Sequence, residues 1–230
     1  RSYYAVHEMR DGVNIYQRPH DFPQLPIVAI CMIPLTWLPH AVATVLFHLL
    51  KVVAAAVAVC CAGRIVTTTP ASPPLAVRPR LWPGTPKDYL LLLAFLMTAR
   101  WLSSDFQHGN VNTFYLMRVL LGLNQFVRGR MIWAGVVMGL SVVFKVTSGL
   151  FLIYFLWKRQ WKCAIATIAS VLLFAVVIPA LVMGPSLAYE STMNWREIMV
   201  EPYQQGFVWM EPRNQSLPGV SYHSLDAAGA

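Results

Sequence analysis

Residues 41–62 read AVATVLFHLLKVVAAAVAVCCA, and residues 164–183 read AIATIASVLLFAVVIPALVM. Each run reaches the roughly 20 apolar residues that a helix needs to cross the hydrocarbon core of a bilayer. In the whole chain of 230 residues, 57% are hydrophobic and only 12% are charged, whereas a soluble domain carries ~25% charged residues. This composition excludes a disordered chain, a secreted disulfide scaffold and an ordinary cytosolic enzyme. It predicts an all-α polytopic membrane protein.

Four further segments accompany these two runs. Pro26–Leu38 is apolar but too short to span a bilayer, and it contains prolines, so we expect an interfacial or re-entrant helix there. Tyr89–Leu102 and Val111–Val127 predict two more membrane helices. Residues 184–202 predict an amphipathic helix along the outer interface, because four polar residues recur on one helical face: Glu190, Asn194, Glu197 and Glu201.

The segments combine into one partial transmembrane domain over residues 1–230. We expect an outer loop with an interfacial helix at 1–40, transmembrane helices over 41–183 and a second outer loop at 184–230. Residues 63–88 contain many prolines, which interrupt a helix and predict a cytoplasmic loop: Pro70, Pro73, Pro74, Pro79, Pro83 and Pro86.

The net charge of +8 lies between the apolar runs, not in a basic stripe with interleaved aromatic residues, so nucleic acid is not an expected partner. The positive-inside rule orients such charges toward the cytoplasm. Nine basic residues then lie on the cytoplasmic side, together with the single acid Asp88. These basic residues are Arg64, Arg78, Arg80, Lys87, Arg128, Arg130, Lys158, Arg159 and Lys162. The bilayer is therefore an expected partner, and the loops at 1–40, 103–110 and 184–230 are expected on the opposite side.

Residues 131–157 form an apolar segment with basic residues at both ends. A single crossing would violate the positive-inside rule, whereas a hairpin of two short helices folded at Lys145–Gly149 satisfies it. One long helix with an anomalous flank is the alternative. A hairpin tip at membrane depth requires burial in protein or a wet cavity, because its backbone polar groups need partners.

Three basic residues lie within apolar segments, and each would cost roughly 2.5–3.5 kcal/mol at the centre of a lipid-facing helix. We expect Lys51 to snorkel or to find a partner. For Arg118, we expect either a functional role or a structural partner. Lys145 precedes Thr147 and Ser148; such a cation with adjacent hydroxyl donors suits a lipid phosphate, and helix capping or snorkelling is the alternative.

Residues 103–112 read SSDFQHGNVN and concentrate hydrogen-bonding side chains between two apolar segments. One interpretation is a turn with a helix cap, because Gly109-Asn110 favours a turn and Asn110 or Asn112 can cap a helix. The other is a contact to carbohydrate or phosphate. The histidines and cysteines show no metal-binding spacing, so we expect no metal site.

Four motifs follow one another in the order seen in a known family. Tyr3-Tyr4 with Gly12 and Tyr16 looks like the first outer loop of polyprenol-dependent glycosyltransferases of the GT-C type. The stretches HGNVN (108–112), GVVMGLSVVFKVT (135–147) and NQSL (214–217) resemble motifs of glycosyltransferase family 87, a mannosyltransferase-like group. Ser148 stands where this family often has proline.

The resemblance implies a GT-C-like helix bundle and an enzyme that transfers a hexose, mannose being expected, from a polyprenyl-phosphate donor to a glycan or glycolipid acceptor. Transfer would occur with inversion at the outer face of a bacterial plasma membrane. The lipid-linked donor is a co-substrate, and no cofactor is expected. The substrate-binding residues would be Tyr16, His108, Asn110, Asn112, Arg118, Lys145, Thr147, Asn214, Gln215 and Ser216, with Asp105 and then Asp11 as the carboxylates nearest the site.

The family's catalytic aspartate lies a few residues before the Tyr-Tyr pair, which would fall ahead of Arg1. We therefore expect a fragment that lacks the first and last transmembrane helices. Two other classes compete with the enzyme. A transporter or flippase for a lipid-linked or anionic substrate would line its path with Lys51, Arg118 and Lys145. A non-catalytic scaffold would use the same motifs only to cap helices.

Overall fold

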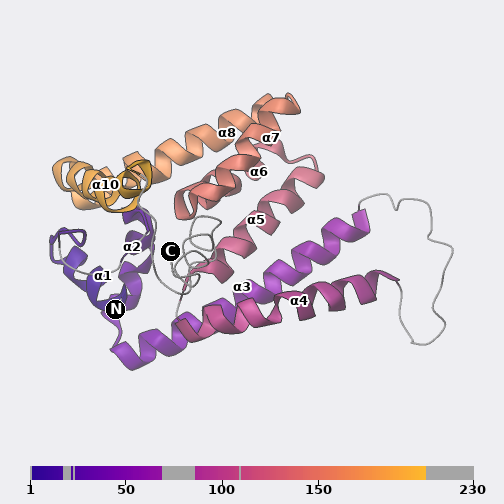
Figure 1. Cartoon of the computed structure of the whole chain (residues 1–230), viewed down its shortest axis with the longest axis horizontal. Helices are drawn as coiled ribbons and strands as arrows, with labels where there is room; N and C mark the ends of the chain where they lie inside the picture. The colour runs from indigo at the N-terminus through magenta and orange to yellow at the C-terminus, as the bar shows by residue number, and fades with distance from the viewer. Residues whose placement is uncertain (1, 18–21, 23, 69–85, 109, 206–230) are drawn as a thin grey trace, which may run out of the picture.

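The computed structural model describes residues 2–17, 22, 24–68, 86–108 and 110–205, and every regular element within them is helical (Figure 1). In chain order they are α1 (Ser2–Arg10), α2 (Pro26–Met32), the 3₁₀ helix η1 (Ile33–Trp37), α3 (His40–Thr68), α4 (Pro86–His108), α5 (Asn112–Val127), α6 (Met131–Phe144), the 3₁₀ helix η2 (Val146–Ser148), α7 (Gly149–Trp157), α8 (Trp161–Leu172), the π-helical segment η3 (Leu173–Val177), α9 (Ile178–Met183), α10 (Pro185–Met199) and α11 (Glu201–Gln204). The all-α prediction is confirmed for the described residues.

Two continuous helices are long and apolar enough to cross a membrane, His40–Val66 and Trp161–Met183. They contain the two runs that the sequence singled out. Only 22% and 17% of their most apolar windows are buried, so these helices expose hydrocarbon on most of their surface. The buried core helix of a soluble protein would not do so, because exposed apolar surface in water is unfavourable.

The second of these helices changes its hydrogen-bonding pattern on the way. Pro179 has no backbone N–H and its ring crowds the carbonyl one turn earlier. The helix widens to the π form over Leu173–Val177 immediately before it, which moves the affected backbone apart without ending the helix.

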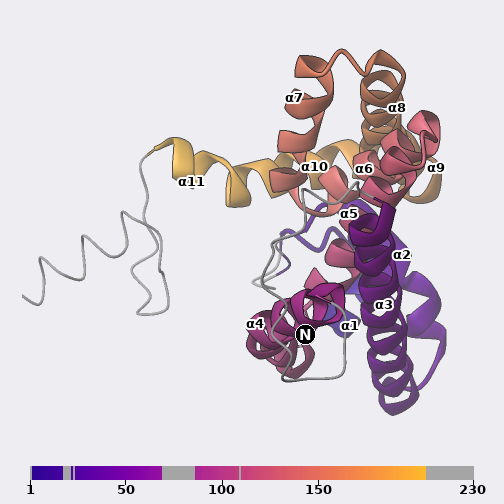
Figure 2. The same cartoon turned by 90° about the vertical axis from the view of Figure 1, so that its right-hand side faces the viewer.

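The central helices pack as a row in the order α3, α5, α6 and α8 (Figure 1). In the view of Figure 2, α7 and α8 lie at one end of this row, and α3 and α4 lie at the other. The elements α1, α2 and α10 gather at the end of the bundle where α3 begins and α9 finishes (Figure 1). We call this the α10 end, and the opposite end, where α6 and α8 begin, the α8-start end.

The hairpin interpretation of residues 131–157 is confirmed. Helix α6 ends at Phe144, η2 turns the chain, and α7 runs back to Trp157. The Phe155 ring near the end of α7 stacks on the Phe126 ring near the end of α5, with ring centroids 5.2 Å apart. Helix α6 starts a few residues after Phe126. The basic flanks of this segment therefore lie at one end of the bundle, as the charge pattern required.

Two loop boundaries differ from the expectation. Helix α3 continues beyond residue 63 to Thr68, and α4 begins at Pro86, because the prolines that stop a helix start only at Pro70 and Pro86 is tolerated in a first turn. Residues 103–108, expected in an outer loop, are the last turns of α4. Their polar character does not break the helix because Asp105 has an internal partner, described below.

Two glycines allow α6 to approach α8 very closely. A Cβ atom at Gly135 would lie 2.4 Å from the Cys163 carbonyl oxygen, and one at Gly139 would lie 2.6 Å from the Thr167 carbonyl oxygen. Ser170 donates a hydrogen bond from its hydroxyl to the Val136 carbonyl at 2.8 Å. This small-residue contact is the typical way in which membrane helices bring their backbones together.

Replacement of Gly139 by alanine should therefore destabilise the protein by about 1–3 kcal/mol, because the added methyl meets backbone that cannot rotate away. Thermal unfolding in detergent measures this. Gly149→Ala is the matched control, since a Cβ there meets nothing within 4 Å. Equal stability of the two variants would contradict the close contact between α6 and α8.

Candidate functional site

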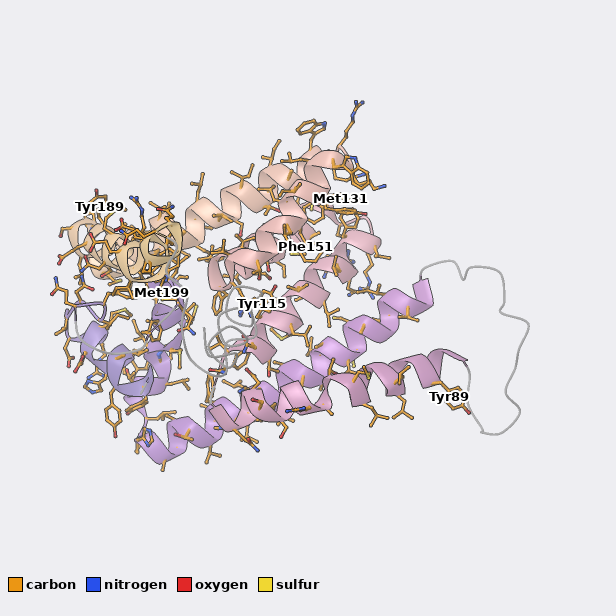
Figure 3. All side chains as sticks on the ribbon, viewed as in Figure 1. Tyr89, Tyr115, Met131, Phe151, Tyr189 and Met199 are labelled. Carbon is orange, nitrogen blue, oxygen red and sulfur yellow. The ribbon has the colours of Figure 1, made fainter. Side chains whose placement is uncertain are left out.

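The site candidates on α5 and at the end of α6 form one group, which we call the cationic cluster: Tyr115, Arg118, Phe144, Lys145 and Thr147. The Arg118 guanidinium carbon lies over the Phe144 ring, 3.6 Å from its centroid. Lys145 Nζ lies 5.4 Å from the centroid of the Tyr115 ring, and the Tyr115 hydroxyl lies 3.5 Å from Thr147 Oγ1. Figure 3 shows Tyr115 toward the N-terminal end of α5. Arg118, predicted separately, thus lies in one group with Lys145 and Thr147.

Arg118 is buried, with 9% of its surface exposed, yet it lacks an anion partner among the described residues. Its Nε and Nη2 atoms are inaccessible to solvent and make no hydrogen bond. A desolvated, unpaired cation is costly, and the ring of Phe144 compensates only in part. Nε and one Nη form the side edge of a guanidinium, which binds an oxyanion with two parallel hydrogen bonds. This edge has the chemistry to bind a phosphate or carboxylate group, but the surrounding protein covers both atoms in this structure, so binding requires neighbouring side chains to move apart.

Cys31 on α2 lies beside this group. The protein packed around the Cys31 thiol raises its pKa, and the Arg118 guanidinium opposes that shift. The residue still keeps an exposed surface, so it offers a labelling position close to Arg118. Phe144 of the cationic cluster packs against the apolar core that contains Ile27, Val28 and Ala29 of α2, so the cluster lies near α2 as well as between α5 and α6.

A second group joins α3, α4 and α5 around a buried ion pair. Lys51 Nζ lies 3.0 Å from Asp105 Oδ2, and both side chains are almost fully buried. The ammonium also donates to the Asp105 backbone carbonyl at 2.6 Å and lies over the Phe106 ring at 4.8 Å. The interpretation that Lys51 is paired is confirmed.

Asp105 in turn holds the start of α5. Its carboxylate accepts hydrogen bonds from the Asn112 N–H at 3.3 Å, the Thr113 N–H at 3.2 Å and the Thr113 hydroxyl at 2.5 Å. The N-terminus of a helix carries a partial positive charge and the C-terminus a partial negative charge. The Asp105 carboxylate at the start of α5 and the Lys51 ammonium at the end of α4 therefore both interact favourably with the helix dipoles. The pair therefore fixes the junction between α4 and α5.

This placement changes the role expected for Asp105. A general base needs a carboxylate oxygen free to receive a proton from the substrate, whereas both Asp105 oxygens accept internal hydrogen bonds. An α-helix rises 1.5 Å per residue, so Lys51 lies about 16 Å along α3 from its first residue, His40. The α4–α5 junction therefore lies beside the interior of the candidate membrane span. The segment expected in an outer loop is set back from the end of that span. This geometry favours a structural role for Asp105.

The remaining predicted residues lie in several places. Asn110 and Asn112 are exposed at the α4–α5 junction, and the Asn110 N–H donates to the Asp105 carbonyl. His108 ends α4, and its side chain lies outside the described residues. Asp11 is half-exposed after α1, 3.3 Å from His7 Nδ1. The predicted Asn214, Gln215 and Ser216 lie outside the described residues.

Tyr16 is buried in the apolar core beneath α1 and α2, and its hydroxyl donates to the Gln24 carbonyl. This position favours a structural role over the substrate contact expected from the resemblance. Burial also raises the pKa of the Tyr16 phenol above its ordinary value of 10.0, so the folded protein keeps it neutral where an unfolded chain would ionise it.

The sign of this effect predicts a pH dependence. The contribution of Tyr16 to stability is fully present below about pH 10 and is lost as pH rises further, because only the unfolded state then releases the proton. Tyr16→Phe should cost about 1 kcal/mol at neutral pH and should weaken the alkaline loss. Thermal unfolding at neutral pH and above pH 10 tests this; an unchanged alkaline loss in the variant would contradict it.

Two contributors to the cationic cluster were missed in the sequence, Tyr115 and Phe144. Tyr115 precedes Arg118 by three residues, the spacing that places side chains side by side on a helix, so a signal for it existed. Phe144 reaches Arg118 from another helix, which no local pattern reveals. Within the described residues, no group of three or more His, Cys, Asp or Glu side chains could hold a metal ion.

Comparison with known proteins agrees with these motifs. The sequence profile of glycosyltransferase family 87 matches residues 25–229. A curated relative from Mycobacterium tuberculosis (strain ATCC 25618 / H37Rv), a polyprenol-phosphate-mannose-dependent alpha-(1-2)-phosphatidylinositol mannoside mannosyltransferase, is 30% identical over 191 residues. That alignment covers 80% of this chain and 40% of the relative, so the chain spans less than half of that protein's length. No solved structure matches the chain. Because the family profile covers most of the sequence, the chain belongs to glycosyltransferase family 87.

Proposed function

We propose that this chain is part of a multi-pass membrane glycosyltransferase of GT-C-like architecture that transfers mannose from a polyprenyl-phosphate donor to a glycan or glycolipid acceptor. The observation that carries the proposal is the unpaired edge of Arg118 beside Lys145, because a buried cation without a partner suits the phosphate of such a donor. Membership of family 87 and the mannose donor named for the mycobacterial relative support the same substrate class.

The reaction needs no cofactor in this proposal. The acceptor hydroxyl oxygen forms a bond to the anomeric carbon while the bond from that carbon to the phosphate oxygen breaks, and its electron pair leaves on the polyprenyl phosphate. Attack from the face opposite the leaving group inverts the configuration. Arg118, Lys145 and the hydroxyl of Thr147 stabilise the charge that develops on the departing phosphate.

The acceptor proton passes to a carboxylate in this scheme. Asp105 does not suit the role, because its oxygens are occupied by Lys51, Asn112 and Thr113. Among the described candidates, Asp11 has the accessible carboxylate. The exposed amides of Asn110 and Asn112 are suited to hydrogen bonds with sugar hydroxyls, and we assign them, with His108, Asn214, Gln215 and Ser216, to the sugar side of the site.

The charge pattern supports the orientation in this proposal. The basic residues at the start of α6 and α8 favour the cytoplasm, which leaves the α10 end and the cationic cluster toward the extracytoplasmic face of the plasma membrane. A transporter fits less well, since its path would use Lys51 as a free cation, whereas Lys51 is buried against Asp105.

Replacement of Lys145 by alanine in the full-length protein tests the proposal. We expect kcat/KM for the polyprenyl-phosphate-mannose donor to fall by about tenfold, since an exposed charge contact of this kind contributes about 1–1.5 kcal/mol. The KM for the acceptor should stay unchanged. Arg196→Gln removes an exposed charge from α10 and serves as control. Unchanged donor kinetics in Lys145→Ala would contradict the phosphate role.

A further inference from the structure

Two tight turns at the α8-start end have the same backbone structure. After α5, the N–H groups of Gly129 and Arg130 donate to the carbonyls of Phe126 and Gln125. After α7, those of Arg159 and Gln160 donate to the carbonyls of Leu156 and Phe155 in the same pattern. Both are helix endings of the Schellman type, which require a left-handed residue just after the helix.

The residue in that left-handed position differs between the turns. Gly129 has a φ of 74°, which glycine adopts without penalty, whereas Arg159 has a φ of 55°, which is unfavourable for a residue with a Cβ atom. Among the described residues, Arg159 alone combines a side chain with a positive φ. Glycine would close this turn better, so the arginine side chain needs another reason.

The turns lie side by side and carry a dense basic surface. The Phe126 ring contacts both Tyr154 and Phe155, at centroid distances of 6.4 and 5.2 Å, and Figure 1 shows both turns at the same end of the bundle. We define the twin-turn patch as Arg128, Arg130, Lys158, Arg159 and Lys162. All five are exposed, and none has an acidic partner in the part of the chain that the structure describes.

Aromatic residues place this patch at a membrane boundary. Trp133, Trp157 and Trp161 are more than half exposed beside it, and Lys158 Nζ lies 4.8 Å from the Trp157 ring centroid. Beyond them the surface becomes apolar, with Ile165 and Ile168 exposed on α8. Exposed tryptophans between a basic and an apolar surface are typical of the headgroup level of a bilayer.

From this geometry we infer that the twin-turn patch is a binding site for anionic phospholipid headgroups. The phosphate of a lipid whose acyl chains lie along α7 and α8 meets the cations of both turns, and Arg159 supplies a guanidinium where a glycine would supply none. Charge complementarity selects anionic over zwitterionic lipids, and each basic residue contributes about fivefold in affinity, the equivalent of about 1 kcal/mol.

The test uses the full-length protein in nanodiscs of phosphatidylcholine with increasing fractions of phosphatidylglycerol, with thermal unfolding and co-purified lipid as readouts. Wild type should be stabilised by phosphatidylglycerol and should retain it. Arg159→Gly should reduce the apparent phosphatidylglycerol affinity about fivefold, while in pure phosphatidylcholine it should be at least as stable as wild type, because the glycine relieves the backbone. Lys162→Gln, which leaves the turn intact, should show the same fivefold loss.

Arg196→Gln, at the α10 end, should respond to phosphatidylglycerol like wild type. Retention of the full lipid preference in both Arg159→Gly and Lys162→Gln would overturn the inference. So would equal stabilisation of the wild type by inorganic phosphate in pure phosphatidylcholine, which would identify a site for free anions. Transferase activity is not the readout, so this result is independent of the proposed reaction.

Discussion

Replacement of Arg118 by glutamine should lower kcat/KM for the lipid-phosphate donor by about 100-fold or more in the full-length protein. Preorganised donors that stabilise developing charge in a water-free site contribute effects of this size, and the Nε and Nη2 atoms of Arg118 are buried and uncommitted. Transfer of mannose from a polyprenyl-phosphate donor, measured with and without the substitution, provides the test.

Two features distinguish this prediction from simple damage to the fold. Arg118→Gln should leave the unfolding temperature unchanged or raise it, because the wild-type cation is desolvated without a partner and its removal relieves that cost. Arg118→Lys should recover part of the activity, since a lysine keeps the charge but loses the planar, two-point contact. Activity within twofold of wild type in Arg118→Gln would contradict the site.

Protection of Cys31 gives a second readout of the same site. The thiol is exposed and close enough to Arg118 to be influenced by its charge. A polyprenyl-phosphate donor bound at Arg118 should slow labelling of Cys31 by a thiol reagent in wild type and much less in Arg118→Gln. The labelling rate thus reports binding even where turnover is lost.

Replacement of Lys51 by alanine should produce the largest loss of stability, about 3–5 kcal/mol, because it leaves the Asp105 carboxylate buried without its cation. Thermal unfolding in detergent measures the effect, and Asp105→Ala should be similarly damaging. The double variant Lys51→Met/Asp105→Asn should be much milder than either single change, since no unpaired charge remains and the asparagine oxygen can still accept from the start of α5.

Arg10→Ala is the control for the ion pair, because Arg10 is exposed and its contact with Asp11 is 3.6 Å long; surface pairs of this kind contribute about 0–1 kcal/mol. A loss in the double variant as large as the two single losses together would contradict the ion pair that the 3.0 Å contact indicates.

The course of the chain through its helices could be read largely from local patterns. The runs at 41–62 and 164–183 became the two candidate spans because length and hydropathy are properties of a continuous segment. The turn at Lys145–Gly149 followed from charge at both ends of one apolar segment. The break expected at 103–110 was wrong for 103–108, since Asp105 within that stretch pairs with Lys51 of the distant helix α3.

The composition of the site divides in the same way. Arg118, Lys145 and Thr147 were singled out as candidates because polar groups in apolar surroundings are expensive and therefore conspicuous. That they gather around Tyr115 and Phe144 was not visible, because Phe144 and Arg118 come from different helices and an aromatic residue in an apolar segment is ordinary core. Asp105 was recognised as unusual, but its ion pair with Lys51 was not visible for the same reason.

By itself, the order of residues determined that this protein is helical, apolar on its outside, basic at one end and a member of its family, because each of these depends on residue types at short separations. Only the tertiary structure decided that Lys51 neutralises Asp105 across 54 positions, while two buried nitrogens of the Arg118 guanidinium have no hydrogen-bond partner among the described residues. Pairing between distant segments depends on how helices pack, and the same kind of charged residue becomes half of an ion pair or an unpaired cation according to which partner that packing supplies.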